Sequence, residues 1–253
     1  MKWLLFVLVS SQAFAMSAAR DPRVPYEFYE AQAHEDSEKI WGTSAMSKAI
    51  RYEKRADLAQ PVRWTPEQLE TAFKMIRDDR FLTWQRRADF PRRASWLFPA
   101  DGCYIRAGLA NQYLDRKQLP AASKIFAFGD LLVDTPYFVT GRASWWYHVA
   151  QVVDVNGVKM VLDPAVEAQR ALTMDEWLAR MGNPQKMKVA ICGQGAYLPK
   201  SRCKDTALFG IAPELLNKTL DQEWDNLSEL KFDPDALLGE APPWTTTSVS
   251  ISK

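Results

Sequence analysis

Three residues of the sequence carry the side chains that catalysis by a cysteine nucleophile requires: Cys103, His148 and Asp163, in that order along the chain. A histidine can take the proton of a thiol, the thiolate can attack a carbonyl carbon, and a carboxylate can orient the imidazole and stabilise its protonated form. The other of the two histidines, His34, lies in a polar stretch where a solvated side chain is expected. The residue types therefore predict Cys103 as nucleophile, His148 as base and Asp163 as orienting carboxylate.

The sequence around Cys103 is typical of a loop that turns into a helix. Asp101-Gly102 is a turn pair, and between Tyr104 and Leu114 the apolar residues recur at helical spacing. The unpaired backbone N–H groups at the start of a helix favour a negatively charged thiolate. A free cysteine is also among the most buried residue types, so the local sequence leaves a small core side chain as an equal alternative.

A predicted hairpin brings the histidine and the aspartate together. Asn156-Gly157 lies between two stretches rich in β-branched and aromatic residues, and this dipeptide favours a two-residue hairpin turn. Stepping outward from the turn pairs Ala150 with Asp163. His148 and Asp163 are then diagonal neighbours on one face, about 7–8 Å apart at the backbone, a distance that their side chains can bridge.

The number of cysteines helps to separate the two interpretations of Cys103. The chain has three cysteines, and in an oxidising compartment an odd number leaves one thiol unpaired. Cys192 and Cys203 flank a short segment rich in turn formers, so we expect a disulfide that contributes about 2–3 kcal/mol in the chain-entropy model. Cys103 is then the free thiol, which favours a nucleophile. The spacing fits no metal site, and no cofactor is expected.

The N-terminus predicts export. Residues 1–15 have the pattern of a secretory signal, with Lys2 before an apolar core and Ala13-Phe14-Ala15 as the cleavage site. No later stretch approaches the roughly 18 consecutive apolar residues of a membrane span. We therefore expect a secreted or periplasmic protein. Residues 16–62 would form a pro-segment or an N-terminal extension, and residues 63–253 a catalytic domain with a C-terminal helix and tail.

The charge balance argues against binding to a polyanion. The formal net charge is +1, so nothing indicates a nucleic acid or an anionic membrane surface as a partner. Residues 84–98 mix arginines with aromatic residues, and in a nearly neutral chain we predict a surface loop that leads to the Cys103 turn. With 47% hydrophobic residues the chain can bury one main core, and a monomer is expected.

Helix caps and periodicity place the remaining elements. A capping box is predicted at Thr65, followed by Pro66 at the first helical position, and a second capping box at Thr173. A further amphipathic helix is expected from Pro213, and the tail beyond Pro234 is expected to be irregular. Strands are predicted over residues 122–133, 145–155, 158–164 and 186–192, with Asp163 at the end of the third of them, where Pro164 ends the strand.

Four motifs follow one another along the chain: FPADGCYIRA at 98–107, FAFGDL at 126–131, WWYHVA at 145–150 and LDP at 162–164. In this order they resemble the motifs of one family, the bacterial secreted protein-glutaminases. The resemblance implies an α+β fold with a transglutaminase-like, papain-like core, in which an antiparallel sheet packs on the helix that carries the cysteine. It also implies a triad of Cys103, His148 and Asp163 that hydrolyses the side-chain amide of protein-bound glutamine to glutamate and ammonia.

The resemblance also bears on the substrate and on the N-terminal segment. Known members are made as pro-enzymes whose pro-segment covers the cleft, a part that residues 16–62 would play. The expected substrates are proteins or peptides with exposed glutamine. Trp145, Trp146 and Tyr147 are candidates to line a groove for the glutamine methylenes, with burial in the core as the equal alternative. The chain departs from the family in having fewer cysteines and Gly108 in place of a histidine, and neither departure touches the triad.

Three other functions use the same residues. A transglutaminase would pass the acyl group of the thioester to a lysine amine, and a papain-like protease would cleave the peptide bond instead of the side-chain amide. A binding or inhibitor module would simply bury the thiol.

Overall fold

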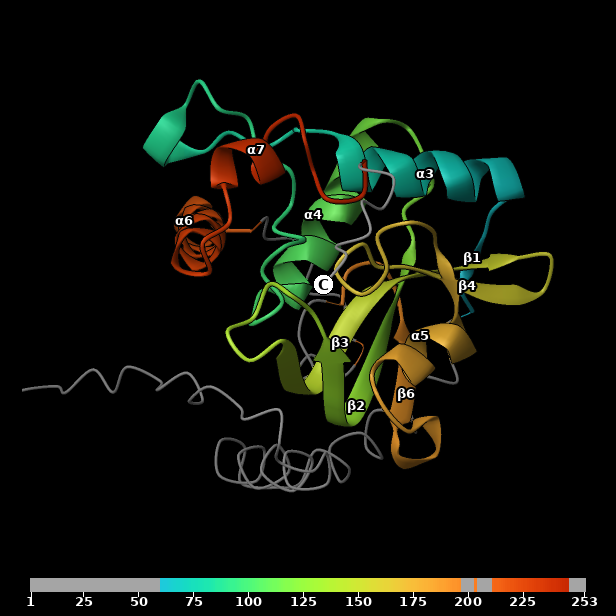
Figure 1. The fold of residues 1–253 in the computed structure, drawn as a ribbon. Helices are drawn as coiled ribbons and strands as arrows, with labels where there is room; N and C mark the ends of the chain where they lie inside the picture. Colours follow the sequence, from blue (N-terminus) through green and yellow to red (C-terminus); the bar gives the residue numbers. More distant parts are fainter. Residues whose placement is uncertain (1–59, 197–202, 204–210, 246–253) are drawn as a thin grey trace, which may run out of the picture.

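A computed structural model of the protein describes residues 60–196, residue 203 and residues 211–245 (Figure 1). The signal segment predicted over residues 1–15 and His34 lie outside these ranges. So does the segment predicted over residues 16–62, apart from its last three residues. The helices are α3 (Pro66–Asp78), η1 (Gln85–Arg87), α4 (Cys103–Arg116), α5 (Met174–Arg180), η2 (Pro184–Lys186), α6 (Pro213–Glu229) and α7 (Pro234–Leu238).

Six strands within the described ranges form one sheet, with β3 at its centre. The order is β5-β4-β3-β2-β6 with antiparallel pairing, and β1 pairs in parallel with β3 beside the start of β2. The strands are β1 (Val62–Arg63), β2 (Ser123–Asp134), β3 (Arg142–Val155), β4 (Val158–Leu162), β5 (Leu172–Thr173) and β6 (Lys188–Cys192).

The predicted hairpin is confirmed. Asn156 and Gly157 have φ angles of 54° and 87°, the left-handed conformations that a two-residue hairpin turn requires at both positions. The pairing of β3 with β4 runs outward from the turn to the pair formed by Gln151 and Leu162. The register up to this pair is the predicted one, but the ladder ends before the expected pairing of Ala150 with Asp163, so Asp163 lies directly after β4.

Helices cover both faces of the sheet. Along β2, Ile125 and Ala127 belong to the apolar cluster that includes residues of α5. The alternate residues Phe126 and Phe128 belong to the cluster that includes Cys103 at the start of α4. Because side chains alternate across a strand, a strand covered on both faces is a continuous apolar run. The α+β class, with a largely antiparallel sheet packed on the cysteine helix, is confirmed.

Residues 84–98, with Arg80 shortly before them, form an arginine-rich segment that is not the surface loop that we predicted. Arg92 is fully buried, and the other arginines of the segment also contact the C-terminal helices, which lie beside it in Figure 1. The prediction was wrong because the acidic partners come from a distant part of the chain. The contacts are Arg80 with Glu240, Arg86 with Asp225 at 2.7 Å, Arg87 with Asp235 at 2.5 Å, Arg92 with Glu223 at 2.5 Å, and Arg93 with the carbonyls of Leu238 and Gly239.

Two details at the C-terminal end test the sequence predictions further. The tail beyond Pro234 begins with the short helix α7 and is not irregular there, because the Asp233 side chain caps it by accepting a hydrogen bond from the Ala236 N–H at 3.2 Å.

The disulfide between Cys192 and Cys203 is confirmed, with the two Cα atoms 5.0 Å apart. In the described part of the chain, no helix is long and apolar enough to cross a membrane.

Candidate active site

Cys103 is the first residue of α4, where the chain leaves a loop and enters the helix. Gly102 makes the turn with a φ of +81°, a left-handed conformation that residues with a Cβ rarely adopt. A Cβ at Gly102 would also lie 3.2 Å from Thr219 Cγ2 in α6. The Cys103 side chain is 8% exposed and its thiol is free. It therefore lies just below the surface, beside the first N–H groups of the helix, which have no partner within it.

The loop before Cys103, residues 95–102, is named the nucleophile loop below, and Arg106 of α4 holds it from one side. The Arg106 side chain is 2% exposed. Its Nη1 donates to the carbonyl oxygens of Phe98 at 2.9 Å and Asp101 at 2.7 Å, with a longer contact of 3.3 Å to that of Ser95. Sequence reasoning did not assign Arg106 a role, although an arginine within an otherwise apolar helix indicates a buried polar partner.

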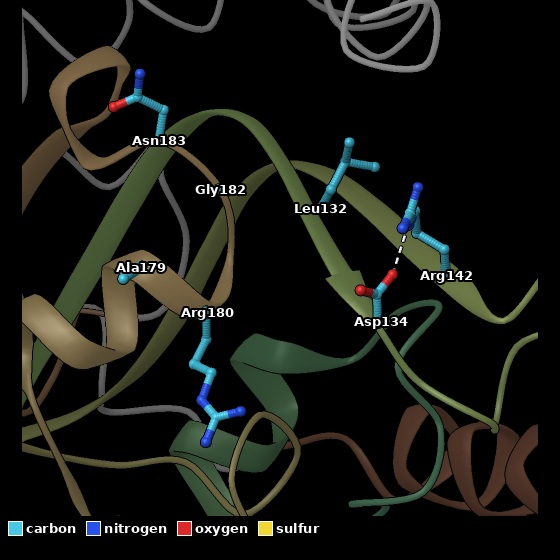
Figure 2. A pocket seen from close by; sticks show the side chains of 7 residues that line it. All are labelled: Leu132, Asp134, Arg142, Ala179, Arg180, Gly182 and Asn183. Carbon is cyan, nitrogen blue, oxygen red and sulfur yellow. Dashed lines mark hydrogen bonds and ion pairs between the residues drawn. The ribbon is translucent and has the colours of Figure 1, made fainter. Parts of the chain in front are cut away.

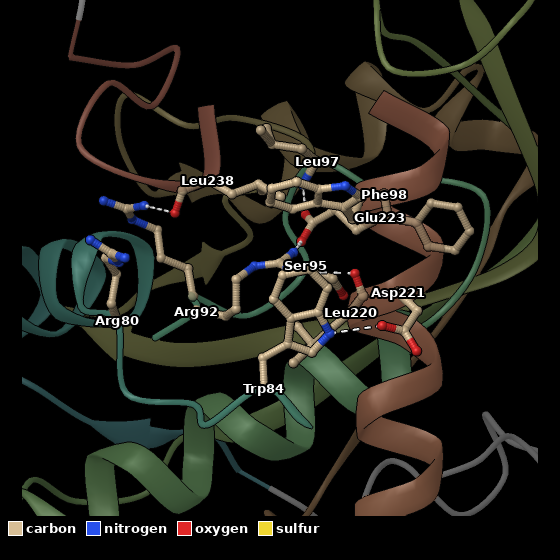
Figure 3. A network of polar contacts seen from close by, with 12 residues as sticks. Arg80, Trp84, Arg92, Ser95, Leu97, Phe98, Leu220, Asp221, Glu223 and Leu238 are labelled. Atoms are coloured by element: carbon tan, nitrogen blue, oxygen red, sulfur yellow. Dashed lines mark hydrogen bonds and ion pairs between the residues drawn. The ribbon is translucent and has the colours of Figure 1, made fainter. Parts of the chain in front are cut away.

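Glu223 of α6 holds the same loop from the other side (Figure 3). One carboxylate oxygen accepts the Leu97 N–H at 2.8 Å, and the other accepts Arg92 Nη2 at 2.5 Å. Both charged side chains are almost completely buried, and this burial raises the pKa of Glu223 in spite of the neighbouring guanidinium. The position of the nucleophile loop therefore depends on a helix more than a hundred residues further along the chain.

His148 and Asp163 form a buried pair. His148 Nε2 lies 2.7 Å from Asp163 Oδ2, and the side chains are 1% and 5% exposed. Burial alone would lower the pKa of His148, but the charge and hydrogen bond of Asp163, together with Cys103, raise it to about 9. Burial alone would raise the pKa of Asp163, but the charge of His148 and hydrogen bonds from His148 and Trp177 hold it below its usual range.

The second ring nitrogen of His148 is available for proton transfer. Nδ1 is buried and makes no hydrogen bond of ordinary geometry with any residue that the structure describes. Cys103 is nevertheless close enough to contribute to the raised pKa of His148. Because Asp163 occupies Nε2, Nδ1 is the nitrogen that is left to exchange a proton with the thiol.

Trp145 contacts both His148 and the nucleophile loop. Its indole is stacked on the His148 ring, with 4.6 Å between the ring centroids and 16° between the planes. Its indole N–H donates to the Pro99 carbonyl at 2.8 Å. An indole held in this way restricts the rotation of the imidazole. It also fixes the position of the nucleophile loop relative to strand β3.

Tyr147 belongs to the apolar cluster around Cys103. Burial, the negative charges of Cys103 and Asp101 and a hydrogen bond with Cys103 raise the pKa of Tyr147 well above its usual value. The phenol therefore stays protonated in the neutral range and can donate a hydrogen bond beside the thiol. Trp146 lies next to it, with 4.6 Å between the two ring centroids.

A β-bulge in β2 lies opposite these aromatic residues. The pairing with β3 shifts between Phe128 and Leu131, where β2 has one residue more than its partner strand, and Gly129 within the bulge has a φ of +148°. Bulges change the direction of the side chains around them and are over-represented next to active sites. The FAFGDL motif of residues 126–131 thus contains the bulge, and Trp146 lies opposite the bulge on β3.

Two surface hollows lie near the site without containing it. One, of about 440 Å³, lies between the β2–β3 hairpin and the end of α5, and Figure 2 shows its lining, with Asp134 paired to Arg142. The other, of about 200 Å³, is bordered by Leu97 of the nucleophile loop and by the residues after Asp163. Cys103 lines neither hollow. Among the described residues, no His, Cys, Asp and Glu side chains are grouped to hold a metal ion.

One family model and several solved structures are similar to this chain. Residues 69–181, which contain Cys103, His148 and Asp163, match a family model described as glutaminase. The chain is similar at 20% identity to a crystal structure of protein-glutaminase, over 76% of this chain and 98% of that one, with a TM-score of 0.44. It is similar at 20% identity to the NMR structure of protein-glutaminase from Chryseobacterium proteolyticum, over 75% and 96%, with a TM-score of 0.45.

A crystal structure of pro-protein-glutaminase is 22% identical over 75% of this chain and 63% of that one, with a TM-score of 0.45. No curated protein matches the chain.

Proposed function

We propose, from the match of residues 69–181 to a family model described as glutaminase, that the protein is a cysteine-dependent amidohydrolase. Its substrate would be the side-chain amide of glutamine within proteins, and its products protein-bound glutamate and ammonia. The observation that carries the proposal is the buried hydrogen bond of 2.7 Å between His148 and Asp163, next to the one free thiol of the three cysteines. A nucleophile, a base and a group that orients the base are the minimum for acyl transfer through a thioester.

The reaction begins with the Cys103 thiolate and the His148 imidazolium. The sulfur attacks the amide carbon, and the carbonyl electrons move onto oxygen to form a tetrahedral intermediate. His148 then donates its proton to the amide nitrogen, the C–N bond breaks, ammonia leaves, and a thioester remains. A water that gives its proton to His148 attacks the thioester, and collapse of the second intermediate releases glutamate and restores the thiolate.

Two donors are candidates to stabilise the oxyanion. The backbone N–H of Cys103 is one of the unpaired groups at the start of α4, and the protonated Tyr147 hydroxyl is the other. Removal of one such donor typically lowers the rate by roughly 100- to 1000-fold. Trp146 and Tyr147 remain our candidates for the wall that the glutamine methylenes contact. Trp145 is engaged with His148 and Pro99, which favours a role in positioning.

We also propose that the protein acts outside the cytoplasm. The Cys192–Cys203 disulfide supports this, since disulfides persist in oxidising compartments, and the signal predicted at residues 1–15 agrees. N-terminal sequencing of exported protein tests the proposal: a mature chain that starts after Ala15 supports export. A later start near residue 62, accompanied by a gain in activity, supports a pro-segment.

The central test is ammonia release from a glutamine-rich protein, with mass spectrometry of that protein. We expect conversion of glutamine to glutamate by the wild type. Cys103→Ala should lower the rate by roughly 10⁴-fold or more, with a change in stability of about 1 kcal/mol or less, because the side chains differ little in volume. Cross-linked product would indicate a transglutaminase, and new peptide N-termini a protease. Full activity of Cys103→Ala would overturn the mechanism.

A further inference from the structure

Trp177 makes a contact with the candidate triad that neither the sequence pattern nor the proposed reaction assigns to a function. It lies in α5 and is fully buried. Its indole N–H donates to Asp163 Oδ2 at 2.8 Å. The same oxygen is 2.7 Å from His148 Nε2. Two N–H donors from different elements thus meet at one carboxylate oxygen.

We propose that Trp177 is a positioning residue: its indole N–H fixes the Asp163 carboxylate so that His148 presents Nδ1 to Cys103. This inference rests on the proposed amidohydrolase function. Trp177 is not part of the apolar cluster that contains Cys103, and its side chain is not exposed to a substrate. Its effect is therefore expected on the turnover of bound substrate and not on substrate binding.

The first argument is geometric. A carboxylate that accepts only one hydrogen bond can rotate about its Cβ–Cγ bond, whereas a second donor at the same oxygen fixes its plane. The His148 ring contacts two indoles, with centroid distances of 4.6 Å to Trp145 and 5.8 Å to Trp177. Each indole N–H is bonded to another part of the site, Trp145 to the Pro99 carbonyl and Trp177 to Asp163. The two tryptophans together determine the orientation of the imidazole.

The second argument is electrostatic. Burial favours the neutral form of Asp163, and the hydrogen bond from Trp177 is one of the interactions that lower its pKa against this effect. The titratable groups that act on His148 are Asp163 and Cys103, and the Arg106 guanidinium acts on Asp163. A neutral or misdirected Asp163 would no longer stabilise the imidazolium, and burial would then dominate the protonation of His148.

The position of Trp177 is set by the start of α5. Thr173 and Glu176 form a complete capping box, in which the Thr173 hydroxyl accepts the Glu176 N–H at 3.3 Å and a Glu176 carboxylate oxygen accepts the Thr173 N–H at 2.8 Å. Trp177 follows directly and packs with Leu178 against the sheet. A fixed helix start and a close-packed ring leave the indole N–H little freedom, as a positioning role requires.

The test compares Trp177→Phe with Trp84→Phe. Trp84 is a matched control, because it is also fully buried and its indole N–H also donates to an aspartate, Asp221, at 2.8 Å. The phenyl ring in Trp84→Phe can remain under the Arg92 guanidinium. We expect Trp177→Phe to lower kcat by roughly 10- to 100-fold, the usual effect of removing a residue that orients a functional group. KM should stay unchanged, and Trp84→Phe should keep the kcat of the wild type.

A second readout does not depend on activity. Because the chain has only two histidines, the imidazole signals of His148 can be followed by NMR as the pH is raised. We expect the pH midpoint of the His148 titration to fall clearly below the wild-type value in Trp177→Phe and to stay unchanged in Trp84→Phe. An unchanged midpoint in Trp177→Phe, or an equal loss of kcat in the control, overturns the role of Trp177. If the wild type deamidates no protein, the proposed function fails, while the NMR result still decides whether Trp177 orients the pair.

If Trp177→Phe does not fold, the benzothiophene analogue of tryptophan can be incorporated at position 177. This analogue removes the N–H with almost no change in shape. The same fall in the His148 midpoint is expected, and an unchanged midpoint again overturns the inference.

Discussion

The protonation of His148 is determined by two opposing influences. Burial favours the neutral ring, and the interactions with Asp163 and Cys103 favour the imidazolium strongly enough to raise the pKa to about 9. A protonated imidazole is the form that can donate a proton to the leaving amide nitrogen. We therefore expect ammonia release to decline as the pH rises through about 9.

The same pKa makes a prediction about stability. Because the pKa of His148 in the folded protein, about 9, exceeds the ordinary value of 6.5, its contribution is fully present below pH 6.5 and lost as the pH rises through 9. The shift corresponds to at most about 3 kcal/mol. Urea unfolding between pH 6 and 10 should show the wild type losing stability relative to His148→Gln, which cannot titrate at this position. Parallel curves for the two proteins would contradict the raised pKa.

The triad candidates could be predicted from the sequence, but the residues that hold them could not. The sequence indicates Cys103, His148 and Asp163 as candidates because their chemistry is specific and because a short hairpin brings two of them together. Arg106 and Trp177 lie in helices, where an arginine is usually read as solvated and a tryptophan as core. Their partners are defined only by tertiary packing, which no local pattern contains.

At the scale of elements, α6 and the nucleophile loop are linked by one buried carboxylate. Glu223→Ala would leave the buried Arg92 guanidinium without its ion-pair partner and the Leu97 N–H without an acceptor. Breaking a buried ion pair in this way typically costs about 3–5 kcal/mol. We expect a loss of this size in urea unfolding, together with a lower kcat, because the loop before Cys103 loses its anchor on α6.

Asp225→Ala is the control for this prediction. It removes the ion pair between Asp225 and Arg86, in which the side chains are 56% and 47% exposed. Surface ion pairs contribute about 1 kcal/mol or less, so this variant should stay close to the wild type in stability and rate. Similar losses in the two variants would show that the burial of Glu223 has no special effect.

The sequence predicted the larger elements well, and the errors have physical reasons. Capping boxes at Thr65 and Thr173 are both present, since these signals are local. The strand expected from residue 186 begins at Lys188, because residues 184–186 form the 3₁₀ turn η2. The arginine-rich segment was misjudged because its acidic partners lie more than a hundred residues away, and α7 because a five-residue helix has almost no periodicity.

At the scale of the whole molecule, the disulfide joins the end of β6 to Cys203. Cys192 ends β6 and is fully buried, and Cys203 packs against the cluster that contains Cys103. A sequence separation of 11 corresponds to about 2–3 kcal/mol in the chain-entropy model. The double variant Cys192→Ser and Cys203→Ser should lose this amount in urea unfolding. Dithiothreitol should destabilise the wild type to a similar degree and leave the double variant unchanged, whereas a wild type insensitive to the reductant would contradict the prediction.

The pairing of two of the three cysteines also affects stoichiometry. In the oxidised protein each chain carries one free thiol, Cys103, so a thiol-directed reagent applied without reductant has one place to react. The amount of reagent consumed then counts the Cys103 thiols directly. The fraction of a preparation that carries a reactive thiol can thus be measured by active-site titration, as for other acyl-transfer enzymes. Reduction would raise the count to three, and the difference would report the integrity of the disulfide in the same assay.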